Sequence, residues 1–215
     1  MIHELKIAPK YFEAVISDKK KFEVRKDDRN YQENDVLLFK EYDNNAYTGR
    51  EYAVLVTYIL RDEYCKDGYC IMSIKHDNYH NTLAILKELG YETISYECTD
   101  YICIFFYKSS EQGKIIYTAQ CEKEGRHCYD VHFGNLEQLW EYDDDTDTDV
   151  KKIRVVGYSF TAILDYTTEA VVKALNEVNE NINREYDYRD ANVYFEDIEG
   201  IIKLYTENHN YTKIE

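Results

Sequence analysis

The stretch Lys21-Phe22-Glu23-Val24-Arg25 alternates polar and apolar residues. A period of two is typical of a half-buried strand, because successive side chains of a strand point to opposite faces. The pattern predicts that Phe22 and Val24 face the core while Lys21, Glu23 and Arg25 share the other face. Such a charged row suggests a strand that floors a polar cleft. The alternative is a solvated edge strand, where charged side chains are ordinary.

Elsewhere in residues 1–75 the apolar pattern predicts short strands and one helix. Pro9 suits the first turn of that helix, and the many turn residues at 43–49 predict a loop. The predicted elements are a strand at 2–7, a helix at 8–16 and strands at 36–39, 52–60 and 69–74. Closing strands this short into a small β-barrel would remove their exposed edges.

A polar stretch that begins at Lys75 suggests a domain boundary, so we place a second domain at 76–215. Asn78 or Asn81 can cap its first helix, and Gly90 can end that helix. The other predicted elements are strands at 93–98, 101–107, 114–120 and 129–133, a short helix at 136–140, one bent strand or a strand pair at 152–164, and helices at 167–178 and 197–205. The sequence therefore predicts an α+β protein, with a small barrel followed by an acidic α+β domain.

The charge is distributed unevenly between these two parts. The chain has a formal net charge of −16. Residues 1–75 hold 13 Lys and Arg and 14 Asp and Glu, which leaves −15 for residues 76–215. The second part should repel nucleic acid, because contacts to phosphate supply most non-specific affinity. It is better suited to a basic protein surface.

Acidic residues gather at one place in the second part, with Thr146 and Thr148 among them. A solvated, mobile loop is one interpretation, because like charges repel. A calcium or magnesium loop is another, although the glycine and the terminal glutamate of the hand-type loop are missing. The third is a contact for a basic partner. The candidate partner-binding residues are Glu141, Asp143, Asp144, Asp145, Asp147 and Asp149.

No signal segment and no apolar run of about 20 residues occurs in the sequence. We expect a protein of the bacterial cytoplasm that does not bind a membrane, with reduced cysteines. The spacing of Cys121, His127, Cys128 and His132 fits no standard zinc site, so buried single thiols are the better interpretation. We expect neither a metal nor another cofactor.

The charged strand also carries a resemblance to a known family. Lys20, Glu23 and Arg25 match the G-x-K-x-x-E-x-R stretch of the ASCH superfamily, a group of PUA-like β-barrels, while Asp18 stands in place of the glycine. The chain most resembles a phage-associated branch of that superfamily. The matching residues are 3–7, Tyr11, Phe12, 22–29, 34–37, Glu41, Tyr42 and 48–50, so the resemblance covers about 1–75.

The resemblance implies that a cleft binds RNA or a nucleotide. Arg25 and Lys20 could hold phosphate, Glu23 could accept from a base amino group, and Tyr47 or Phe22 could stack a base. The alternative is an ion-pair network that is purely structural. The candidate binding residues are Lys20, Glu23, Arg25, Arg29, Tyr47 and Arg50.

Lys20 and Glu23 are also weak candidates for catalysis. Some members of the superfamily are amidohydrolases that use a Lys followed three residues later by a Thr. Glu23 stands at that position here, so the hydroxyl group of that chemistry is absent. An enzyme is therefore the less favoured interpretation.

Three hypotheses follow for the function. The first is a phage or mobile-element protein that binds RNA or a nucleotide through its barrel and a basic protein through its acidic domain. The second is an inhibitor of a host nucleic-acid enzyme, such as a defence nuclease, that acts through the acidic surface. The third is a nucleotide or RNA hydrolase.

Overall fold

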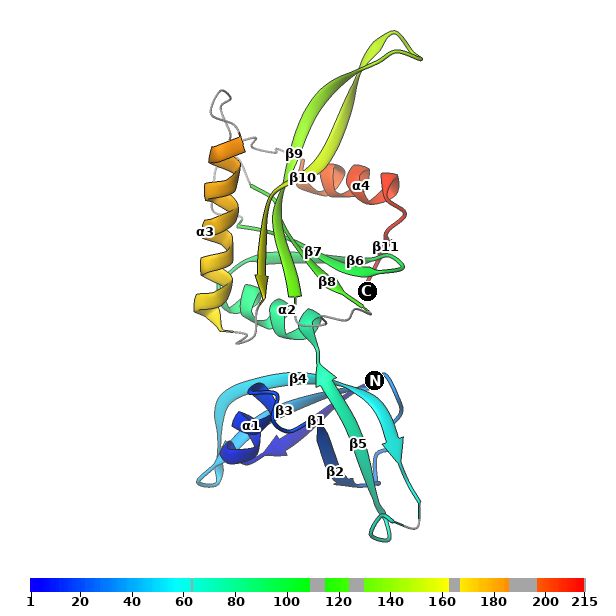
Figure 1. Ribbon diagram of the computed structural model, residues 1–215, viewed down its shortest axis with the longest axis vertical. Coiled ribbons are helices and arrows are strands. Elements are labelled where there is room, and N and C mark those ends of the chain that lie inside the picture. Colours follow the sequence, from blue (N-terminus) through cyan, green and yellow to red (C-terminus); the bar gives the residue numbers. More distant parts are fainter. Residues whose placement is uncertain (63, 109–114, 124–129, 163–166, 186–196, 215) are drawn as a thin grey trace. The chain divides into compact units, whose positions relative to one another are not determined.

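The computed structural model describes residues 1–62, 64–108, 115–123, 130–162, 167–185 and 197–214 (Figure 1). The chain divides into two compact units, Met1–Asn81 and Thr82–Glu215. Each unit combines a β-sheet with helices, and most of its regular structure is strand. The α+β class predicted from the sequence is confirmed.

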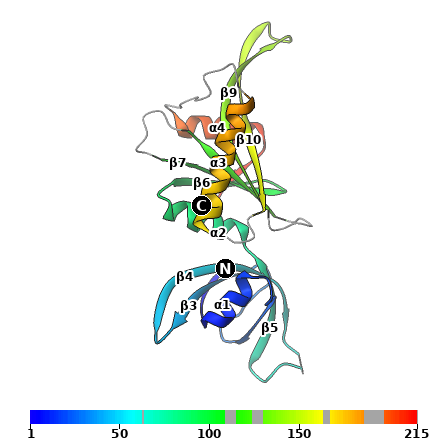
Figure 2. The same cartoon turned by 60° about the vertical axis from the view of Figure 1, so that its left-hand side comes forward.

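The first unit is a five-stranded sheet that curls into a half-barrel (Figures 1 and 2). Its elements are β1 (Ile2–Ile7), α1 (Pro9–Ile16), β2 (Phe22–Lys26), β3 (Val36–Asp43), β4 (Ala46–Leu60) and β5 (Tyr69–His76). The strand order is β1-β3-β4-β5-β2, and β1 runs parallel to β3 while the other pairs are antiparallel. β1 and β2 are thus the two edges, and the backbone ladder does not close the predicted barrel.

The core of this unit lies inside the curl. Alternate residues of β1 and β5 are buried, as the period of two requires. α1 adds Phe12 and Val15 to the core. The pairing of β4 with β5 shifts register between Val56 and Tyr58. A bulge of this kind bends a strand and increases its twist, which helps the sheet to curl.

The connection between β3 and β4 is shorter than predicted. Asn44 and Asn45 have φ angles of +46° and +63°, and Asp43 pairs directly with Ala46. Positive φ at both central residues is the geometry of a type I′ hairpin turn, which favours Asn and Gly. The loop predicted at 43–49 is therefore wrong in length, because residues 46–49 already belong to β4.

α2 (Asn78–Glu88) begins in the first unit and ends in the second. Its cap is Asp77, whose Oδ1 accepts a 3.0 Å hydrogen bond from the His80 amide, rather than Asn78 or Asn81 as predicted. Asn81 instead forms two hydrogen bonds with the backbone of Ala53, at 2.8 and 2.9 Å. Gly90 follows the helix with φ +79°, so its predicted role as a helix stop is confirmed.

The second unit is an antiparallel six-stranded sheet with helices on both faces (Figures 1 and 2). α4 buries Ile198, Ile201, Ile202 and Tyr205 against one face, in a cluster with Phe105. α3 lies against the opposite face, where Glu177 accepts from Ser159 of β10. The elements are β6 (Glu92–Glu97), β7 (Tyr101–Tyr107), β8 (Tyr117–Glu122), β9 (Asp130–Asp143), β10 (Thr148–Ala162), α3 (Thr168–Glu185), α4 (Ile198–Asn208) and β11 (Thr212–Lys213).

β9 and β10 form a hairpin that extends beyond the rest of the sheet (Figure 1). β8 pairs with β9 only as far as Asn135. Among the described strands, residues 137–143 pair with β10 alone, so this part is a two-stranded arm. The short helix predicted at 136–140 is wrong, because those residues belong to β9. The acidic loop is the turn at 144–147 that joins the two strands.

None of the helices within the described ranges is long and apolar enough to cross a membrane.

Candidate functional site

The charged strand β2 presents its faces in the opposite sense to the prediction. Glu23 is 6% exposed, whereas Phe22 and Val24 are 51% and 46% exposed. The alternation is confirmed, but Glu23 and Arg25 belong to the face that points into the half-barrel, and the apolar row points out. Lys20 and Arg25 explain the inversion, because two cations beside Glu23 offset the cost of removing its charge from water.

Both oxygens of Glu23 are engaged. Oε2 contacts Nζ of Lys20, and Oε1 lies 2.8 Å from Nε of Arg25. Lys20 follows a tight turn in which Asp18 has φ +57°, a conformation that favours glycine. Lys21 does not join this group, since it is exposed and forms an ion pair with Asp18 at 2.7 Å.

Arginine side chains close the gap between the two sheet edges. Nη2 of Arg25 donates to the carbonyl of Lys6 at 2.7 Å, and Nη1 of Arg29 donates to the carbonyl of Glu4 at 2.8 Å. Both acceptors lie on the edge strand β1, and Arg25 lies on the edge strand β2. We call this junction the seam. There, guanidinium groups occupy edge carbonyls that a neighbouring strand would otherwise bond.

A pocket of about 320 Å³ opens at the seam. Its charged groups are three cations and one carboxylate, and two tyrosines add aromatic surface. Burial raises the pKa of the Tyr31 phenol, and the nearby Arg29 and Arg25 partly oppose that rise, so Tyr31 is neutral at physiological pH. The lining residues are Leu5, Val24, Arg25, Lys26, Asp28, Arg29, Tyr31 and Tyr69.

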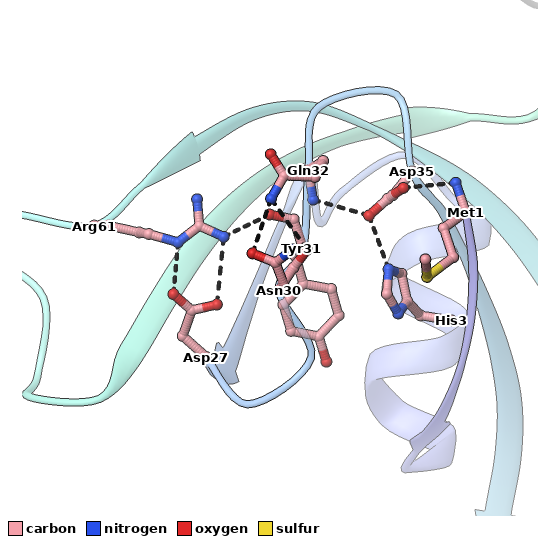
Figure 3. Close-up of polar contacts among 8 residues, drawn as sticks. All are labelled: Met1, His3, Asp27, Asn30, Tyr31, Gln32, Asp35 and Arg61. Atoms are coloured by element: carbon pink, nitrogen blue, oxygen red, sulfur yellow. Dashed lines mark hydrogen bonds and ion pairs between the residues drawn. The ribbon is translucent and has the colours of Figure 1, made fainter.

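The segment between β2 and β3, which carries Arg29 and Tyr31, is fixed on its β2 side (Figure 3). Arg61 makes a two-pronged contact with Asp27, at 2.5 and 3.3 Å. The same guanidinium donates to the carbonyl of Tyr31 at 2.5 Å. Gln32 donates to Asn30 within the segment. Because Arg61 directly follows β4, these contacts connect the pocket wall to the end of that strand.

Asp35 fixes the β3 side of the same segment (Figure 3). It accepts from the α-amino group of Met1 at 2.6 Å, from the Gln32 amide at 2.8 Å, and contacts Nε2 of His3 at 2.8 Å. Burial raises the pKa of this carboxyl, but the hydrogen bonds from Met1, His3 and Gln32 outweigh burial and bring it to about 2. Asp35 is thus a charged anchor at neutral pH.

Sequence reasoning missed these supporting residues. His3 occupies a core-facing position in the alternation of β1, which is a signal for a buried polar group with a partner. Asp35 follows Asn34, and this pair of residues by itself indicates only a turn. Nothing local marks Arg61, because its partners Asp27 and Tyr31 are about thirty residues away.

Tyr47 and Arg50 lie apart from the seam pocket. Together with Glu4, Lys40, Gly49 and Glu51 they line a second pocket, of about 270 Å³. The two pockets share no lining residue. The structure therefore brings Lys20, Glu23, Arg25 and Arg29 together and places the other two candidates elsewhere.

Arg50 and Tyr47 of the second pocket already contact other side chains of the same unit. Arg50 donates to Glu13 at 2.7 Å and to the buried Glu41 at 3.2 Å, and its guanidinium lies 4.7 Å from the centre of the Phe12 ring. The ring of Tyr47 packs edge-on against Tyr42 at 5.1 Å. These contacts link α1 to the β3–β4 hairpin.

The acidic candidates of the second unit cluster at the end of the arm. Asp144, Asp145 and Asp147 are exposed in its turn. Glu141 and Asp143 belong to β9, and Asp149 belongs to β10. Within the described ranges, no three His, Cys, Asp or Glu side chains are grouped so that they could hold a metal ion. His127 and Cys128 lie outside these ranges.

Comparison with known proteins matches the first unit. Residues 2–74 match the family described as "Domain of unknown function (DUF3850)". The chain is also 43% identical over 56 residues to an uncharacterized 12.9 kDa protein in the GpA 3′ region of Escherichia phage P2. That match covers 26% of this chain and 51% of the phage protein, so the chain spans about half the length of this relative. The similarity supports a phage or mobile-element protein.

Proposed function

We propose that the seam pocket binds the phosphate of a nucleotide or of RNA. The observation that carries this proposal is the grouping of Arg25, Lys26 and Arg29 around one pocket with the single acid Asp28, in a chain of net charge −16. The pocket volume of about 320 Å³ lies at the lower end of the range for small-molecule sites, roughly 300–1,000 Å³. The resemblance to ASCH proteins points to the same ligand class.

Each residue has a separate role in this proposal. The planar guanidinium of Arg29 donates to Glu4 through one nitrogen, and an Arg side chain has five N–H donors, so others can take a phosphate oxygen. Lys26 adds a point charge at the exposed rim. Glu23 orients Arg25 by their ion pair. Lys20 is engaged by Glu23 and acts as a positioning residue.

Titration of the full-length chain with fluorescent UMP and with a short single-stranded RNA tests this proposal. We expect Arg29→Ala to weaken binding of both ligands, and affinity to fall as salt rises, because phosphate contacts release counterions. Lys10→Ala, which removes a cation on α1 instead, is the matched control. Binding that is equal in the two variants, or independent of salt, would contradict the proposal.

The arm supports a second candidate function, which is contact with a basic protein such as a host nucleic-acid enzyme. Asp144, Asp145 and Asp147 are exposed at the tip of a two-stranded arm. Charges at the end of a projection can approach a concave basic site with little steric hindrance, and complementary charge speeds such association.

Inhibition assays on purified host nucleases test this second candidate. The double variant Asp144→Asn/Asp145→Asn should lose inhibition of the target nuclease. Glu88→Gln/Glu207→Gln changes the charge equally at exposed positions of α2 and α4, so it should retain inhibition. Equal inhibition by both double variants would show that the arm is not the contact.

A further inference from the structure

The outer face of β2, β5 and β4 exposes apolar side chains that a phosphate pocket alone does not explain. Phe22 and Val24 of β2 are about half exposed, and Tyr58 of β4 is 55% exposed. Single exposed apolar residues are normal, but contiguous exposed patches mark binding surfaces.

Strand register makes these residues neighbours. Phe22 pairs with Ser73, which pairs with Tyr58. One row further along, Val24 pairs with Ile71, which pairs with Leu60. Adjacent strands lie about 4.8 Å apart, so the backbones of Phe22 and Tyr58 are separated by roughly 10 Å across β5.

Cations flank this row of apolar side chains. Lys26 pairs with Tyr69 at one end, and Lys75 pairs with Leu55 at the other. None of the residues that the register places on this face is acidic, although the chain as a whole is strongly negative. The residues of the face, all exposed or half-buried, are Phe22, Val24, Lys26, Leu55, Tyr58, Leu60, Tyr69, Ile71, Ser73 and Lys75.

The face is continuous with the seam pocket. Val24, Lys26 and Tyr69 belong to the outer face and also line the pocket. A ligand whose phosphate lies between Arg25 and Arg29 can therefore continue onto the sheet without leaving protein surface. A mononucleotide is too short to use Phe22 and Tyr58 as well, whereas a strand of several nucleotides can.

We propose that the ligand is a single-stranded nucleic acid that runs from the seam pocket across the outer face, with bases stacked on Phe22 and Tyr58. This inference rests on the proposed function and names its ligand class. Aromatic side chains on an open sheet stack unpaired bases, and Lys26 and Lys75 meet the phosphates. Ser73 is the one uncharged hydrogen-bonding side chain in the row between the rings, so sequence preference should be small.

The affinities of the full-length chain for oligo(U) RNA and for UMP distinguish binding along the outer face from binding of phosphate in the seam pocket alone. An RNA of about eight nucleotides is within the range of single-strand sites. We expect it to bind at least tenfold more tightly than UMP. Phe22→Ala and Tyr58→Ala should each weaken RNA binding by about fivefold or more, the effect of one lost base stack, while UMP affinity stays unchanged.

Matched variants guard against indirect effects. Tyr11→Ala removes an exposed ring of α1 and should leave both affinities unchanged. Because Lys20 Nζ lies 5.3 Å from the Phe22 ring, Phe22→Ala could disturb the seam. Phe22→Trp keeps a ring in place and should restore RNA binding, which a purely structural defect would not predict.

The remaining outcomes overturn the inference in distinguishable ways. If UMP binds and depends on Arg29 but RNA binds no more tightly, the proposed function stands and the inference fails. If neither binds, both fail. If Phe22→Ala and Tyr58→Ala dissociate a dimer in sedimentation without changing RNA affinity, the face is an interface between two copies and the inference is wrong. An equal affinity for oligo(dT) would extend the ligand class to single-stranded DNA, as the chemistry of the face allows.

Discussion

The side chain of Arg25 donates to the backbone carbonyl of Lys6 across 2.7 Å. Arg25 lies on β2 and Lys6 lies on β1, and these strands are the two edges of their sheet. A side chain thus performs, at this place, the function that a backbone ladder performs in a closed barrel.

Replacing Arg25 by Ala should destabilise the protein by about 2–3 kcal/mol, because Glu23 keeps a buried charge with only one cation and the Lys6 carbonyl loses its donor. Urea unfolding followed by circular dichroism measures the change. Lys26→Ala, which removes a neighbouring exposed cation, should alter stability by less than about 0.5 kcal/mol. Equal losses in the two variants would mean that the seam contributes nothing specific.

Lys20 and Glu23 should be energetically coupled, because Glu23 is buried and contacts Lys20 directly. In a double-mutant cycle with Lys20→Met and Glu23→Gln, we expect an interaction energy of about 1–3 kcal/mol. Lys21 and Glu23 serve as the comparison pair. Since Lys21 pairs with Asp18 instead, its cycle with Glu23 should give a value near zero.

Asp35 should make stability depend on acid pH. Its pKa is lowered from 3.8 to about 2 in the folded chain, so the stabilising charge is fully present above pH 3.8 and is lost as pH falls through about 2. The loss amounts to about 2 kcal/mol. Asp35→Asn should be less stable at neutral pH, and its unfolding free energy should lack this acid-dependent part. A parallel pH dependence in both proteins would contradict the assignment.

His76 should produce a pH dependence at milder acidity. Burial lowers its pKa in the folded state from 6.5, and Asp18 only partly opposes that change. The unfolded chain therefore binds a proton at higher pH than the folded chain, so stability falls as pH drops below about 6.5. Tyr52 donates to or accepts from Nδ1 of His76 at 2.5 Å. His76→Gln should flatten the stability profile across this range, measured by thermal unfolding at stepped pH.

The sequence predicted most elements, because their apolar periods are regular. The charged strand shows the limit of such reasoning. An alternation of Phe22, Glu23 and Val24 defines two faces but not which one is buried. That choice depends on Lys20 and Arg25 neutralising Glu23, and on the Lys6 carbonyl that receives Arg25 from another strand. A local sequence pattern does not reveal these contacts.

The arm was missed for a related reason. Leu136, Leu139 and Trp140 have helical spacing over a window too short to separate helix from strand. Their strand conformation comes from pairing with residues 151–155 of β10. Two residues of the seam pocket, Arg25 and Arg29, could be predicted, because Arg25 belongs to the recognisable charged motif and Arg29 follows it closely. The extent of the site could not be predicted, since Tyr47 and Arg50 lie in another pocket, where Arg50 bonds to α1 and β3.

The two-stranded arm also has a consequence for colloidal behaviour. Among the described strands, residues 137–143 pair with β10 alone, and unpaired strand edges are a template on which further copies could stack into fibrils. Asp144, Asp145 and Asp147 place like charges at its end, so two ribbons that approach tip to tip repel each other. We therefore expect the acidic turn to oppose the association of extended hairpins at high concentration.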